Sequence, residues 1–80
     1  FPNPFTDHLT ISVFVDEPTT VSIDVYNLAG QNVGVIVPSA RVENEQSFVW
    51  DANSKLLPKG VYIVRVKTLE TMVTKKVSLL

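Results

Sequence analysis

Apolar and polar residues alternate with a period of two along most of this chain, and no other feature constrains the fold as strongly. Successive side chains of a β-strand point to opposite faces, so a strand with one buried face produces this alternation. No window shows the apolar spacing of three to four residues that marks an amphipathic helix. The sequence therefore predicts an all-β protein.

Turn-forming residues divide the alternating pattern into short strands. The predicted strands are 9–15, 20–26, 32–37, 47–50, 61–67 and 74–80. In the second of these, Val21, Ile23 and Val25 share the face expected to point inward. Pro38 is predicted to end the third, because proline removes a ladder donor. The polar segment 39–46 is predicted as a loop with a short edge strand in it.

Six to seven short strands in 80 residues predict an immunoglobulin-like antiparallel β-sandwich. The chain has no cysteine, so this sandwich has no disulfide. Trp50, the single tryptophan, is expected at the centre of the core because of its large apolar area. Residues 1–80 are predicted to form one domain. Since the chain begins with Phe1 rather than Met, we expect it to be a fragment of a longer secreted protein.

Two glycine-containing motifs are assigned structural roles first. Asn27 and Gln31 flank a predicted hairpin turn, in which Gly30 can adopt the positive φ that short β loops require. Gly60-Val61-Tyr62 is interpreted as a strand start, where glycine absorbs a bend and the tyrosine hydroxyl reaches a backbone partner. A contribution of both motifs to recognition stays an alternative.

The residue types needed for enzyme chemistry are scarce. His8 is the single histidine and cysteine is absent, so neither a zinc site of the usual ligands nor a cysteine nucleophile can form. The carboxylate pairs Asp16/Glu17 and Glu43/Glu45 are explained by solvated turns, although weak calcium binding stays open. We therefore expect no catalytic residue, no metal site and no cofactor.

Charge is unevenly distributed along the chain. Residues 1–50 hold one arginine and six carboxylates, a net charge of −5, and residues 51–80 hold six basic residues and two carboxylates, a net charge of +4. Because strands from both segments interleave in a sandwich, we expect mutual neutralisation across strands rather than a nucleic-acid-binding face. No apolar run approaches the roughly 20 residues that span a bilayer, so no transmembrane segment is predicted.

Five phrases, taken in order, resemble the C-terminal sorting domain of proteins exported by the type IX (Por) secretion system. The phrases are Phe1-Pro2-Asn3-Pro4-Phe5, Val25-Tyr26-Asn27-Leu28-Ala29-Gly30-Gln31-Asn32-Val33, Trp50-Asp51, Leu57-Pro58-Lys59-Gly60-Val61-Tyr62 and Thr74-Lys75-Lys76-Val77-Ser78-Leu79-Leu80. The resemblance covers the whole chain. It departs from the family at 39–46, where many members have a glycine-rich approach to the tryptophan strand.

The resemblance implies a non-catalytic signal domain that directs its cargo protein through the periplasm and across the outer membrane. It further implies contacts with translocon or shuttle proteins, and removal by a sortase-like cysteine peptidase that attaches the cargo to the cell surface. The expected location is secreted or cell surface. The alternative is an accessory carbohydrate-binding, adhesive or spacer module, for which Phe5, Phe14 and Tyr26 are the candidate stacking residues.

The last strand is the candidate recognition site. A lysine on an edge strand commonly protects against aggregation, and this explanation competes with a functional one. In the functional hypothesis a translocon component pairs with the strand edge, with lysines supplying charge and the terminal leucines and carboxylate acting as anchors. Exposed edges also allow a strand-exchanged dimer. The hypothesised recognition residues are Lys75, Lys76, Val77, Ser78, Leu79 and Leu80.

Overall fold

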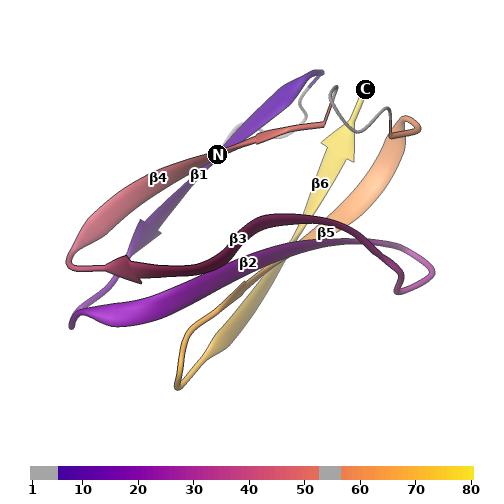
Figure 1. Cartoon of the computed structure of the whole chain (residues 1–80). Helices are drawn as coiled ribbons and strands as arrows, with labels where there is room; N and C mark the ends of the chain where they lie inside the picture. The colour runs from indigo at the N-terminus through magenta and orange to yellow at the C-terminus, as the bar shows by residue number, and fades with distance from the viewer. Residues whose placement is uncertain (1–5, 53–56) are drawn as a thin grey trace.

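The computed structural model describes residues 6–52 and 57–80, in which the chain forms six β-strands (Figure 1). The Phe1-Pro2-Asn3-Pro4-Phe5 phrase lies outside these residues. The strands are β1 (His8–Phe14), β2 (Thr19–Asn27), β3 (Asn32–Val42), β4 (Glu45–Asp51), β5 (Gly60–Lys67) and β6 (Met72–Leu79).

The strands form two antiparallel sheets. One sheet contains β1 and β4, and the other has the order β3-β2-β5-β6, so the two-stranded sheet packs on one side of the four-stranded sheet (Figure 1). This arrangement confirms the predicted all-β sandwich. Within the described ranges no helix is long and apolar enough to cross a membrane.

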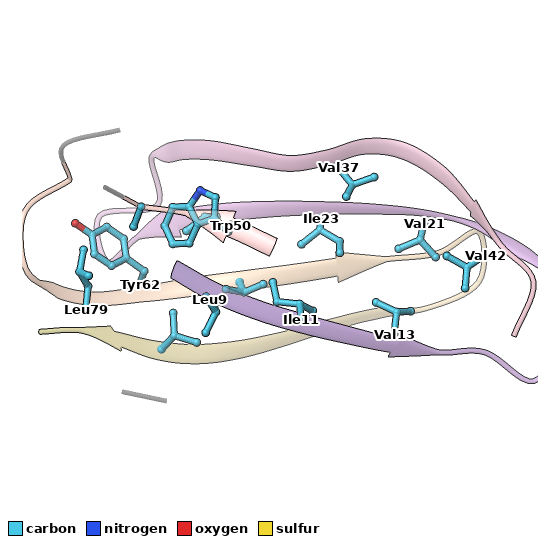
Figure 2. Packing of buried hydrophobic residues seen from close by; sticks show 14 residues of the cluster. Leu9, Ile11, Val13, Val21, Ile23, Val37, Val42, Trp50, Tyr62 and Leu79 are labelled. Carbon is cyan, nitrogen blue, oxygen red and sulfur yellow. The ribbon is translucent and has the colours of Figure 1, made fainter. Parts of the chain in front are cut away.

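The core forms where the inward faces of the two sheets meet (Figure 2). Val21, Ile23 and Val25 of β2 are fully buried, as the alternation predicts. A fully buried valine or isoleucine stabilises the fold by about 1.5–3 kcal/mol relative to an exposed one. The buried hydrophobic residues are Leu9, Ile11, Val13, Val21, Ile23, Val25, Val37, Val42, Trp50, Ala52, Tyr62, Val64, Val77 and Leu79.

The prediction that Pro38 ends the third strand is wrong. Strand β3 continues to Val42, and its ladder with β2 resumes at the pair Val21–Ala40 after a register shift. A proline is tolerated within this strand for two reasons. β3 is an edge strand, and the register shift leaves an extra residue of β3 at the proline. Most of 39–46 is therefore strand, shared between the end of β3 and the start of β4.

Trp50 is a core residue, with 4% of its surface exposed. It lies toward one end of the core rather than at its middle, beside Tyr62 and Leu79 (Figure 2). Its ring meets that of Tyr62 edge-on, with the centroids 6.4 Å apart. A Cβ atom at Gly34 would lie 3.3 Å from Trp50 Nε1, so the absence of a side chain there makes room for the indole.

The turn from β2 to β3 confirms the predicted role of Asn27. Its side-chain Oδ1 accepts hydrogen bonds from the backbone N–H groups of Ala29 and Gln31, both at 3.0 Å, and its Nδ2 donates to Gln31 Oε1 at 2.8 Å. Gly30 has a φ of 85°, in the left-handed region. These contacts close the hairpin and set the start of β3.

Replacing Gly30 with alanine is expected to lower the free energy of unfolding by about 1–2 kcal/mol. No atom lies within 4 Å of the position that a Cβ would take, so the cost comes from the backbone conformation alone. Urea unfolding measures this loss. Gly30→Asn is the matched control and should lose less, because asparagine tolerates positive φ better than alanine does; equal losses would contradict this explanation.

Candidate recognition surface

Strand β6 lies at an edge of the four-stranded sheet and pairs with β5 from Gly60–Leu79 to Lys67–Met72. In an antiparallel pair about half of the backbone N–H and C=O groups of a strand point away from its partner. Within 6–52 and 57–80, no strand pairs with the outer side of β6. Among the described strands, β6 is therefore an edge of the four-stranded sheet.

The inward face of β6 is buried only in its C-terminal half. Val77 lies opposite Tyr62 and is 1% exposed, and Leu79 is also buried. Val73 and Lys75 share that face, but both are exposed. The strand is therefore anchored in the core at its C-terminal half and accessible at its N-terminal half.

The opposite face of β6 carries the second lysine of the predicted site. Lys76 lies opposite Ile63 and is exposed, whereas Ser78 lies opposite Val61 and is partly buried. Leu80 follows the strand and is 58% exposed. Of the hypothesised recognition residues, Lys75, Lys76 and Leu80 thus offer side chains at the surface, whereas Val77 and Leu79 belong to the core.

Gly60-Val61-Tyr62 forms the start of β5, the strand that pairs with β6, as its sequence predicts. Tyr62 is 5% exposed, and its hydroxyl donates a hydrogen bond to the carbonyl oxygen of Pro58. Gly60 has a φ of 150°, which allows the chain to bend into β5. Tyr62 lies at the end of the core that also holds Leu79 (Figure 2).

Cross-strand charge neutralisation occurs on the outward face of the four-stranded sheet. Asp24 and Arg65 are register partners, and Arg65 Nη2 lies 2.8 Å from Asp24 Oδ2. The guanidinium also lies over the Tyr26 ring, 4.8 Å from its centroid. The hydrogen bond to Asp24 raises the pKa of Arg65. This pair confirms one case of the expected neutralisation between the acidic first part and the basic last part of the chain.

The single histidine, His8, is the first residue of β1. Its Nδ1 is 2.9 Å from Asp7 Oδ1, and its backbone N–H donates to the same oxygen at 2.7 Å. Both side chains are 59% exposed. The contacts fit a local turn. In the described part of the chain, no three histidine, cysteine or carboxylate residues gather in a way that could hold a metal ion.

A family model, described as a secretion system C-terminal sorting domain, matches residues 1–79 of the chain. The match includes every described strand. No curated protein and no solved structure shows significant similarity to the chain.

Proposed function

This chain belongs to the secretion system C-terminal sorting domain family, and we propose that the secretion machinery recognises it at the open edge of β6. The domain is a sorting signal for type IX secretion. Membership implies contact with the secretion machinery and export to a secreted or cell-surface location. Domains of this family are in general not catalytic.

One observation carries the proposal: β6 is an edge strand of the sheet, and it carries both apolar and positively charged side chains that are exposed. Met72 and Val73 are 58% and 55% exposed, and they stand beside the exposed Lys75 and Lys76. Lysines alone on an edge would be explained by protection against aggregation. Exposed apolar residues on the same strand weaken that explanation and fit a surface that is covered during recognition.

The mode of recognition that fits this surface is strand addition. A partner strand beside β6 would gain affinity from main-chain hydrogen bonds and specificity from alternate side chains. Val73 and Lys75 point to one face and Lys76 to the other, so the partner would be contacted on both faces. Carboxylates next to either lysine would add favourable cross-strand pairs.

The proposal also covers the route by which the domain is exported and its removal after export. Residues 1–80 act as a single domain attached to a cargo protein, which crosses the periplasm and then the outer membrane through the translocon. A sortase-like cysteine peptidase then removes the domain as the cargo is attached to the cell surface. Family membership supports these steps.

A carbohydrate-binding module is less well supported. Stacking on a sugar needs several aromatic rings on one face. Phe14 belongs to the two-stranded sheet and Tyr26 to the four-stranded sheet, and Arg65 covers the Tyr26 ring. The family match likewise favours a sorting signal over a spacer.

The double substitution Lys75→Glu/Lys76→Glu is expected to reduce export at least about tenfold. Reversed charge at a recognition surface opposes association by several kcal/mol, and each 1.4 kcal/mol is about tenfold in affinity. The measurement fuses residues 1–80 to a periplasm-targeted fluorescent protein in a host with this secretion system, and compares fluorescence in the medium and at the cell surface with that in the periplasm.

The matched control is Lys59→Glu/Lys67→Glu, which changes the net charge equally at two exposed lysines outside β6. Both proteins should melt within about 4 °C of the parent domain, because surface substitutions have small effects. Equal export of the two variants would contradict the proposal. Deleting 77–80 is a weaker test, since it removes the core residues Val77 and Leu79.

A further inference from the structure

A groove lies at the end of the sandwich away from Tyr62 and Leu79, between the β1–β2 connection and the β5–β6 turn. It is separate from the C-terminal half of β6, where the chain is anchored in the core. The lining residues are Phe14, 15–19 and 68–71.

Two large apolar side chains stand exposed in this groove. Phe14 is 72% exposed and Leu69 is 84% exposed, more than any other large hydrophobic residue of the described ranges. Phe14 points outward because it alternates with the buried Val13 on β1. Apolar side chains that gather at a concave surface commonly mark a place where another molecule binds.

The turn that carries Leu69 is built by hydrogen bonds. Thr68 Oγ1 accepts from the backbone N–H groups of Glu70 and Thr71, at 3.2 and 3.0 Å, and the Thr68 N–H donates to the Thr71 carbonyl oxygen at 2.9 Å. The backbone around Leu69 is therefore held in one conformation. A preformed groove loses less entropy on binding than a flexible loop does.

The groove is acidic. Asp16, Glu17 and Glu70 line it, and none of its described lining residues is lysine or arginine. Glu45 is the register partner of Phe14, so a fourth carboxylate stands beside the aromatic ring on the same face of the two-stranded sheet. The nearby turn between β3 and β4 adds Glu43, which Arg41 approaches at 3.5 Å.

We propose that this groove binds an extended, lysine- or arginine-rich peptide segment of a partner protein, with aliphatic side chains of that segment packing on Phe14 and Leu69. Charge complementarity selects the cationic partner, because the carboxylates attract basic side chains and repel anionic surfaces such as lipid headgroups. The exposed Phe14 ring and the exposed Leu69 side chain favour a peptide that also carries aliphatic side chains. The sorting domain thus has a second binding surface, distinct from the β6 edge.

The test is a titration of the ¹⁵N-labelled 80-residue chain with an end-blocked peptide of alternating lysine and leucine, followed by NMR. Chemical-shift changes are expected at 14–19 and 68–71. Leu69→Ser should weaken binding about tenfold, because the substitution removes most of an apolar contact. Binding should also weaken at about 1 M salt, where the Debye length falls to about 3 Å.

Two controls separate this site from unspecific adhesion. Val35→Ser changes an apolar residue of β3 that is 50% exposed, and it should leave binding unchanged. A peptide of alternating glutamate and leucine should not bind. The proposal is overturned by absent shifts at 14–19 and 68–71, by equal binding of the two peptides, or by shifts centred on β6. Concentration-dependent shifts without peptide would overturn it too, since they would show a second copy as the occupant.

Discussion

Replacing Trp50 with alanine is expected to lower the free energy of unfolding by about 3–5 kcal/mol. The indole is 4% exposed and packs against Tyr62 and over Gly34, so its removal takes apolar contacts from both sheets and leaves a cavity between them. Domains of this size are commonly stable by about 5–15 kcal/mol. Because an 80-residue domain buries a small core, its stability is expected near the lower end of this range, where this loss leaves the variant marginally folded.

Urea or thermal unfolding, followed by far-UV circular dichroism, measures this loss. Phe14→Ala is the matched control, because it removes another aromatic ring that is 72% exposed. It should change stability by no more than about 0.5 kcal/mol. A loss below about 1 kcal/mol for the tryptophan variant would mean that the two sheets hold together without the indole.

The second large effect is expected from an aspartate placed on β6. Val77→Asp should cost about 3–5 kcal/mol, because it puts an unpaired carboxylate opposite Tyr62 in the core. Val73→Asp changes the same residue type on the same face of the same strand, four residues earlier, where the side chain is 55% exposed. It should cost less than about 1 kcal/mol.

Unfolding and export measured on the same pair of variants separate folding from recognition. If the machinery reads the folded domain, Val77→Asp loses export together with stability. Val73→Asp keeps the fold and lowers export, because Val73 lies on the exposed half of the proposed edge. Full export of the unfolded Val77→Asp variant would show instead that the secretion machinery reads a linear sequence.

Strand β6 thus serves the fold and the proposed recognition at the same time. Val77 and Leu79 hold it in the core, while its outer edge and Lys75 and Lys76 stay accessible. Such a strand is presented correctly only when the sandwich has formed, since the core contacts position the edge. A sorting signal built in this way would couple export to folding of the domain, and the two aspartate variants test that coupling directly.

Local patterns were sufficient to predict several features. Alternation assigned Val21, Ile23 and Val25 to the buried face, and the residue types of Asn27 and Gly30 predicted their turn. Tyr62 was correctly expected to bury its ring and to reach a backbone partner with its hydroxyl, and that partner is the Pro58 carbonyl oxygen. Each of these follows from the chemistry of a few neighbouring residues. The family, too, was identified from short phrases along the chain, and the family match confirms it.

Contacts between distant segments could not be read in this way. Pro38 stays within β3 because that strand lies at an edge of the sheet and because its register with β2 shifts beside the proline, and both depend on how β3 pairs with the rest of the sheet. Alternation places Val73 and Val77 on the same face of β6, yet only Val77 is covered in the folded domain, whereas Val73 is 55% exposed.

The groove shows the same division, because its two highly exposed large apolar side chains, Phe14 at the end of β1 and Leu69 in the β5–β6 turn, come from segments far apart in the chain. The sequence determined which face of each strand is apolar and where the chain turns, since both depend on neighbouring residues. Only the tertiary structure decided which of those apolar residues are covered and which acidic and apolar residues meet, since that depends on how the sheets are ordered and how far one extends over the other.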